Sequence, residues 1–236
     1  DGFQDLFVAN ISREKFSLYR NQKDNNFEDV AGPTGIAMAT IMDTGWGIRF
    51  FDYDLDGWPD IIMANGHPDD LIETISSSLH YREPLLLFHN TGHGFEDVSA
   101  QGGPAFAARY PARGLAVGDL DNDGRPDVVI ANNGGAPVIL HNVLKNSHHW
   151  IGLNLAGLQV GTQITWSAGG VEHSVFHRGG GSYLSSSDPR DLLGLGEAAY
   201  ADWIQIRWPA AVGKTDRFEH VASGKYYSLA PGGKLR

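Results

Sequence analysis

Residues 52–65 read DYDLDGWPDIIMAN, and residues 119–132 repeat the pattern as DLDNDGRPDVVIAN. The second part of the pattern also opens the chain, as DGFQDLFVAN at residues 1–10. Each copy has Asp-Gly, an Asp three residues after the Gly, an apolar run and a final Ala-Asn. A short apolar run bounded by Gly, Pro and Asp is typical of a β-strand. The repeated unit therefore predicts a tight turn that leads into a strand.

The similarity between the units extends to both sides of this pattern. A second strand that ends in Asn follows each copy, at 18–21, 87–90 and 140–142. In the first two units a Phe-Glu-Asp-Val run comes next, at 27–30 and 95–98. A further strand precedes the second and third copies, at 47–52 and 114–119. The Asp-Gly pairs are 55 and 67 residues apart. Short strands at a long, nearly fixed period predict a β-propeller. The extra length of the second unit, at 66–84, predicts a surface excursion with one helical turn.

We therefore predict an all-β chain, with a partial β-propeller of about three blades at 1–146 and a small β-sandwich-like domain at 147–236. Residues 204–208 alternate apolar and polar side chains, as a half-buried strand does. Segments 163–166 and 171–176 follow the same rule, with Gly169-Gly170 as the hairpin turn between them. Propellers close with roughly 4–8 blades. The remaining blades are expected from upstream sequence or from another chain.

Composition excludes several classes of function. The formal net charge is -10 and there are no cysteines. An acidic surface repels phosphate backbones, so we expect no nucleic-acid partner. Without cysteine, the chain has no disulfide, no thiolate metal site and no cysteine nucleophile. The purely apolar runs are far shorter than a membrane span requires, so no membrane span is predicted.

The two complete acidic loops have the donor pattern of a calcium site. Carboxylates stand at positions 1, 3, 5 and 9 of each loop, and position 7 offers a backbone carbonyl. Alternate aspartates in a tight turn converge on one point, and oxygen ligands of this number favour Ca²⁺ over Mg²⁺. The predicted ligands are Asp52, Asp54, Asp56, Trp58 and Asp60 in one loop, and Asp119, Asp121, Asp123, Arg125 and Asp127 in the other. A third, partial site at Asp1 and Asp5 is possible on the same pattern.

Two other structures could contain such an acidic loop. An EF-hand shares the first six positions, but its twelfth position requires Glu and a helix must follow. Here the twelfth positions are Met63 and Ile130, within apolar runs. The other alternative is a solvated turn, because Asp and Gly are common in turns. Several carboxylates around one point repel each other by about 1 kcal/mol per pair in water and about 4 at an effective dielectric near 20, which favours a bound cation.

The repeats resemble the FG-GAP/VCBS repeats of integrin-type and bacterial extracellular propellers. The runs HHWIGLNLAG (148–157), VGTQITW (160–166), GGGSYLSSSDPRDLLGLG (179–196) and WIQIRWP (203–209) resemble an ASPIC/UnbV domain. With the Asn-Gly-His at 65–67, this order of units is similar to bacterial relatives of cartilage acidic protein. The chain departs from the family pattern at 192–193, where Leu-Leu replaces His-Phe, and at 210–211, where Ala-Ala replaces Ser-Gly. The resemblance implies an exported, calcium-binding protein without an established activity.

The leading hypothesis is a calcium-binding interaction or scaffold module that has no catalytic activity. We expect it to be extracellular, at the cell surface or periplasmic. Its ligand would be a protein or a glycan, and its role would be in adhesion. One alternative is a polysaccharide-binding or polysaccharide-processing protein, for which Glu172, Glu197 and Asp202 are available acids. Another is a subunit that completes a propeller within a larger assembly. The G-x-G-x-x-A run at 194–199 and the serines at 185–187 are read as turns. His89 and His141, at equivalent repeat positions, indicate a repeated surface environment.

Overall fold

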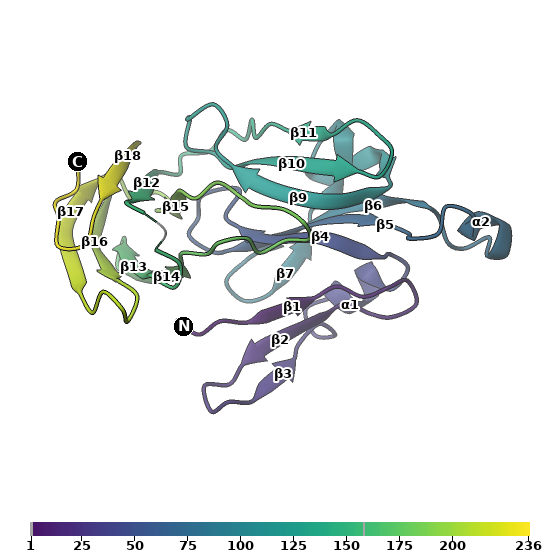
Figure 1. Ribbon diagram of the computed structural model, residues 1–236, viewed down its shortest axis with the longest axis horizontal. Helices are drawn as coiled ribbons and strands as arrows, with labels where there is room; N and C mark the ends of the chain where they lie inside the picture. Colours follow the sequence, from purple (N-terminus) through teal and green to yellow (C-terminus); the bar gives the residue numbers. More distant parts are fainter. Residues whose placement is uncertain (1, 158) are drawn as a thin grey trace.

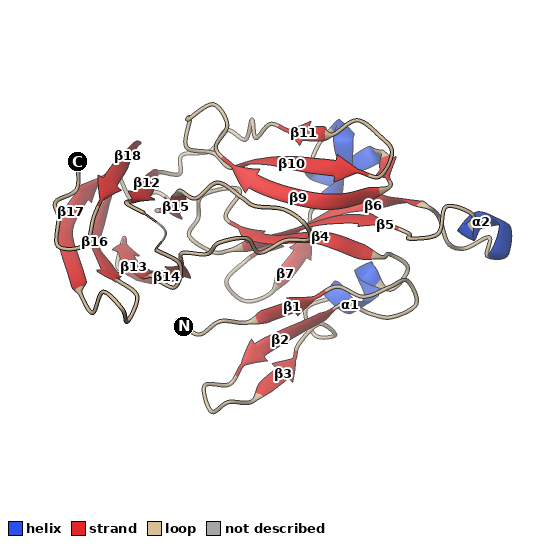
Figure 2. Ribbon diagram, viewed as in Figure 1, coloured by secondary structure: helices blue, strands red, loops and turns tan. Residues whose placement is uncertain are grey.

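The computed structural model describes residues 2–157 and 159–236. Within these residues the strands form five sheets, and the helices are short (Figure 2). Three sheets lie side by side, and the other two form a separate C-terminal domain at one end of the molecule (Figure 1). In this described part, no helix is both long and apolar enough to cross a membrane. The prediction of an all-β fold is confirmed.

The first two blades follow the repeat. Blade 1 contains β1 (Leu6–Val8), β2 (Ser17–Asn21) and β3 (Phe27–Asp29). After the short helix α1 (Ile36–Thr40), blade 2 contains β4 (Gly45–Phe51), β5 (Asp60–Gly66), β6 (Arg82–Asn90) and β7 (Phe95–Asp97). The predicted excursion at 66–84 carries the single helical turn α2 (Ile72–Ile75). Among the described residues, the sheet of blade 1 contains no strand that corresponds to β4.

Blade 3 contains β9 (Ala112–Gly118), β10 (Asp127–Asn132) and β11 (Val138–Leu140). Two 3₁₀ turns, η1 (Ser99–Gln101) and η2 (Pro104–Ala107), and the short strand β8 (Arg109–Tyr110) connect it to blade 2. The strands pair antiparallel within each blade. The three sheets are therefore copies of one meander that differ at their edges.

Strand β5 explains why the apolar runs are continuous rather than alternating. Every residue of β5 is buried. Ile61 and Met63 lie in the core between blades 1 and 2, whereas Ile62 and Ala64 lie in the core between blades 2 and 3. A strand with neighbours on both faces needs apolar side chains on both faces. Packing of blade against blade, and not against solvent, therefore sets this sequence pattern.

The C-terminal domain is a sandwich of two sheets around its own core. One sheet has the order β15 (Asp191–Gly194), β12 (Trp150–Leu155) and β18 (Lys225–Leu229); the other has the order β14 (Val171–Phe176), β13 (Gln163–Ala168), β16 (Tyr200–Arg207) and β17 (Thr215–Ala222). Gly169 and Gly170 both have positive φ, at 57° and 81°. This is the backbone that a two-residue type I′ hairpin requires, so the predicted turn is confirmed.

A segment of the C-terminal domain, residues 177–190, extends back along the blades. We call it the arm. It leaves β14, lies along β4 and β9, and returns into β15 (Figure 1). The N–H of Ile48 in β4 donates to Ser182 Oγ at 3.2 Å, and the N–H of Val117 in β9 donates to Ser187 Oγ at 3.1 Å. Serines of the arm thus satisfy backbone groups of two blades, and Ser187 is the one that belongs to the run read as a turn.

Candidate metal centre

The two acidic loops connect the first two strands of blades 2 and 3, at the blade ends that face the C-terminal domain (Figure 1). Their backbones have the same shape. Leu55 and Asn122, at the fourth position, have φ of 65° and 62°, and the glycines at the sixth position have φ of 92° and 88°. Such positive values strain residues with a Cβ but suit glycine. The sixth-position glycine is therefore a requirement of the loop.

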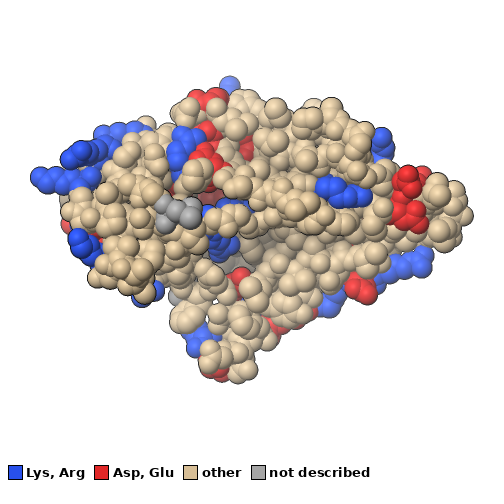
Figure 3. Space-filling view, in the orientation of Figure 1, with Lys and Arg blue, Asp and Glu red and all other residues tan. Residues whose placement is uncertain are grey.

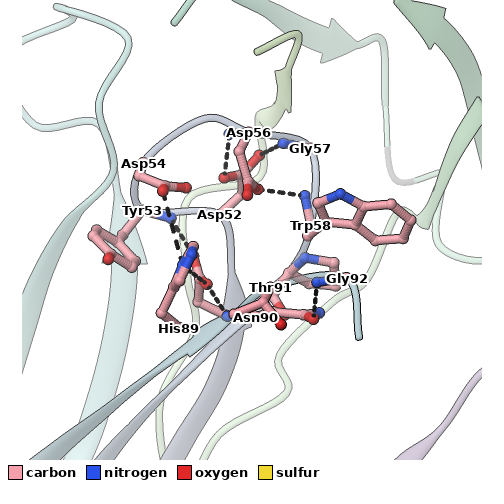
Figure 4. Close-up of polar contacts among 12 residues, drawn as sticks. Asp52, Tyr53, Asp54, Asp56, Gly57, Trp58, His89, Asn90, Thr91 and Gly92 are labelled. Carbon is pink, nitrogen blue, oxygen red and sulfur yellow. Dashed lines mark hydrogen bonds and ion pairs between the residues drawn. The ribbon is translucent and has the colours of Figure 1, made fainter. Parts of the chain in front are cut away.

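The first aspartate of each loop closes the turn. Asp52 accepts hydrogen bonds from the N–H groups of Asp56 (3.1 Å) and Gly57 (2.9 Å), as Figure 4 shows. Asp119 accepts the equivalent bonds from Asp123 (3.0 Å) and Gly124 (2.8 Å). The loops therefore share hydrogen bonds as well as backbone shape.

The ninth aspartate joins the loop to the next strand. Asp60 Oδ1 accepts from the N–H of Asn90 at 2.7 Å, and Asp127 Oδ1 accepts from the N–H of Asn142 at 2.8 Å. The other carboxylate oxygen, Oδ2, accepts from the N–H of the second loop residue, at 3.1 and 3.0 Å. In blade 1, Asp5 Oδ1 accepts from the N–H of Asn21 at 2.8 Å. The Asn that ends the second strand of each repeat thus has a structural partner, although Asp1 lies outside the described residues.

Sequence reasoning did not assign the two equivalent histidines to the loops. His89 Nδ1 lies 3.1 Å from Asp60 Oδ1 and 3.8 Å from Asp54 Oδ2. In blade 3, His141 Nδ1 lies 3.0 Å from Asp127 Oδ1, and its Nε2 lies 3.8 Å from Asp121 Oδ2. Their equal positions in the repeat were the available signal. The missing information was that the end of the second strand returns to the loop.

The structure brings most of the predicted carboxylates together. Ligand atoms lie within 4.8 Å of one another in three groups: Asp52, Asp54 and Asp56; Asp54, Asp60 and His89; and Asp119, Asp121 and Asp127. Asp123 instead forms an ion pair with Arg125. Trp58 and Arg125 use their N–H groups to bind Asp56 and Asp123, and the ligand role of their carbonyls stays a prediction. Oxygen donors of this kind suit a hard divalent cation.

The electrostatics of the blade 2 loop favour a bound cation. Burial, with the charges of Asp60 and Asp56, raises the pKa of Asp52 well above its usual value. Burial also raises the pKa of Asp56, and it raises that of Asp60 to about 7. Among the described residues, Asp54 Oδ1 is buried and has no hydrogen-bond partner. A bound cation would stabilise the charged form of these carboxylates, and it would also give the unpaired carboxylate oxygen a partner.

The C-terminal domain covers both loops. The N–H of Gly196 donates to Leu55 O at 2.9 Å, and a Cβ on Gly194 would lie 2.0 Å from Asp52 Oδ2. The Tyr226 hydroxyl donates to Asp119 Oδ2 at 2.6 Å, and Arg190 Nη2 donates to Asp119 O at 2.8 Å. The G-x-G run at 194–196 is therefore a close-packed turn. An EF-hand is excluded, because β5 and β10 rather than helices follow the two loops.

Comparison with known proteins agrees with this architecture. The family model described as FG-GAP-like repeat matches residues 1–63 and 66–130, which is more than half of the chain, and the model described as ASPIC and UnbV matches residues 154–236. Cartilage acidic protein 1 from Xenopus tropicalis is 27% identical over 128 residues, which cover 54% of this chain and 17% of that protein. The chain thus spans less than a fifth of that relative. The chain belongs to the FG-GAP-like repeat family, with an ASPIC and UnbV domain following its repeats.

Proposed function

We propose that this chain is a calcium-binding, extracytoplasmic interaction module without catalytic activity of its own. Its two complete loops would each hold one Ca²⁺, through Asp52, Asp54, Asp56 and Asp60 in blade 2 and through Asp119, Asp121 and Asp127 in blade 3. FG-GAP-like repeats and the ASPIC and UnbV domain suggest interaction rather than chemistry. The domain boundary between 146 and 147 remains part of this proposal.

The observation that carries the proposal is that one loop occurs twice with the same positive-φ positions and the same carboxylate contacts. A chance group of solvated acids would not reproduce that arrangement. The buried, unpartnered Asp54 Oδ1 adds independent support. When bound, Ca²⁺ would supply positive charge, and the chain would provide oxygen ligands from two loops that are held between paired strands.

An exported location follows from the same reasoning. Extracellular modules bind calcium with dissociation constants of about 10⁻⁴–10⁻³ M, which is useful where free calcium is abundant. Cartilage acidic protein 1 is named for cartilage and for its acidity, and this chain also has a formal net charge of -10. Secretion or display at the cell surface therefore suits the proposed site.

Calorimetric calcium titration and thermal melting test the proposal. Free calcium at 100 times its dissociation constant should stabilise the folded chain by about 2.7 kcal/mol per site. We expect excess chelator to lower the melting temperature by several degrees. The double variant Asp54→Asn, Asp121→Asn removes the third-position charges, which serve few internal hydrogen bonds, and should abolish the calcium response. Asp70→Asn, at an exposed acid outside the loops, is the matched control.

Two results would contradict the proposal. One is a melting curve that does not change between excess calcium and excess chelator. The other is an equal calcium response in the double variant and in Asp70→Asn. Turnover of a polysaccharide by the purified chain would instead support the enzymatic alternative.

A further inference from the structure

A cavity of about 370 Å³ lies where the arm and the C-terminal domain meet the blades. Its wall includes Arg49 from β4, Arg178 from the start of the arm, and Trp58 from the blade 2 loop. Figure 3 shows Lys and Arg side chains beside Asp and Glu side chains where the two parts of the molecule meet. The volume lies within the range of small-ligand sites, roughly 300–1,000 Å³.

The two arginines have unused hydrogen-bond donors. Arg49 donates one bond within the described chain, from Nη1 to Gly180 O at 2.6 Å. Arg178 makes no hydrogen bond or ion pair with any described residue. A guanidinium carries five N–H donors in a planar fork that fits carboxylate and sulfate groups. Most of the donors of this pair therefore remain free for a ligand.

The neighbouring acids offset the charge of this pair only in part. Asp188 binds Arg190, and Asp191 binds His177 at 2.8 Å. Burial, followed by the charge of Arg178, lowers the pKa of Arg49, and the charge of Asp191 opposes this shift. Burial also lowers the pKa of Arg178, although the residue as a whole is exposed. Two cations that repel each other beside a cavity are stabilised by an anion between them.

The rest of the wall indicates what carries the anion. Trp58 is 36% exposed and lies at the cavity, where its ring meets His173 edge-on at 5.3 Å. An accessible indole provides a flat apolar face for the C–H surface of a sugar ring. The cavity is small and combines charged hydrogen-bond donors with an aromatic surface. It therefore fits a compact acidic ligand better than an extended polymer.

We propose that this cavity binds an acidic sugar, with Arg49 and Arg178 holding its carboxylate or sulfate and Trp58 packing against its ring. The candidate metal ligands Asp52 and Asp119 also line the cavity. Calcium on those aspartates would remove negative charge from the wall and so tighten sugar binding. Only this effect of calcium depends on the proposed function. The arginine site itself does not depend on it.

Titration of the whole chain with sodium glucuronate, followed by NMR or calorimetry, tests the site. We expect glucuronate to bind and glucose not to bind. Arg178→Gln, which breaks no hydrogen bond or ion pair within the described chain, should weaken glucuronate binding about tenfold. Arg207→Gln, at an exposed arginine on β16 away from the cavity, should have no effect. Binding should also weaken as salt rises.

Three outcomes would overturn the inference: equal binding of glucose and glucuronate, no binding of glucuronate, or equal binding by the Arg178→Gln and Arg207→Gln variants. Equal binding of acetylglycine would show a general carboxylate site and refute the sugar. Titrations in excess calcium and in excess chelator separate the two proposals. Whether glucuronate binding depends on Arg178, in either buffer, decides the sugar proposal. The calcium calorimetry decides the proposal that the acidic loops bind calcium.

Discussion

At the scale of single residues, Asp60 and Asp127 show that the loop aspartates are not equivalent. Each accepts backbone hydrogen bonds from its own loop and from the following strand end. Their side chains are almost fully buried, with 0% and 1% exposed. Loss of such a carboxylate would leave backbone N–H groups unsatisfied. Third-position aspartates are therefore better suited than ninth-position aspartates to a test of metal binding.

Tyr226 is one of the residues whose side chains join the C-terminal domain to the blade 3 loop. We expect Tyr226→Phe to destabilise the chain by about 1–2 kcal/mol, because a partly buried hydrogen bond to a charged group is lost while the ring remains. Urea unfolding measures the change. Tyr200→Phe, at a tyrosine that is 47% exposed, is the control. Equal stability of the two variants would show that the Tyr226 bond contributes nothing to the fold.

Glu83 is a buried acid outside the metal loops. It is 1% exposed; Oε2 accepts from the N–H of Thr44 at 2.7 Å, and Oε1 has no partner among the described residues. Burial raises the pKa of Glu83 to about 8, with a contribution from nearby Asp43, whose own pKa burial raises to about 6. Glu83 is thus protonated in the folded chain at pH values where the unfolded chain has lost that proton.

The sign of the pH effect follows from that difference. The folded state binds more protons between about pH 4.3, the ordinary value for Glu, and about pH 8, so the free energy of unfolding should fall across this range. Glu83→Gln keeps an acceptor for Thr44 and cannot ionise; it should flatten the slope. Urea unfolding at several pH values measures it, with exposed Glu96→Gln as control. A slope unchanged by Glu83→Gln would show that this carboxyl titrates normally.

At the scale of elements, β5 has two buried faces that belong to different cores. Ile61→Ala and Ile62→Ala should each cost about 2–5 kcal/mol, since each leaves a cavity in one blade interface. Ile139→Ala on β11, where the side chain is 62% exposed, should change stability by less than about 0.5 kcal/mol. Denaturant unfolding compares the three. A small effect of either β5 variant would mean that one interface is not packed as described.

The base of the arm is another feature at this scale. His177 at its start and Asp191, the first residue of β15 directly after it, form an ion pair at 2.8 Å. The hydrogen bond to Asp191 raises the pKa of His177, so this histidine keeps its charge to a higher pH than an unperturbed histidine would. The pair holds together the two ends of a segment that otherwise lies on the blades. The arm is thus anchored at its base as well as along β4 and β9.

At the scale of the whole molecule, the C-terminal domain sits on the candidate metal loops, and the linker between the two parts is attached to one of them. Asn146 Nδ2 donates to Asp54 O at 2.6 Å, and His148 Nδ1 lies 2.6 Å from the same oxygen. A change in the order of the blade 2 loop must therefore affect the linker.

Chelation should loosen this junction. We expect trypsin to cleave after exposed Lys145 faster in chelator than in calcium, since the loop that holds the linker is then less ordered. Gly194→Ala, which places a Cβ against Asp52, should be cleaved rapidly even in calcium, whereas Gly32→Ala, with open space around it, should behave as the parent chain. Gel analysis of the fragments measures these rates. Calcium-independent cleavage of the parent chain would show that the loops do not control the junction.

The sequence is enough to predict the repeat, the three strand meanders, the Gly169-Gly170 hairpin and the acidic loops, because these depend on neighbouring residues and on a pattern present in several copies. Only the packing of the folded chain places His89 and His141 beside the ninth aspartates and brings Arg49 and Arg178 to one cavity. Contacts of this second kind join residues far apart in the chain. Local sequence carries no signal for them, because they arise only when blades and C-terminal domain pack together.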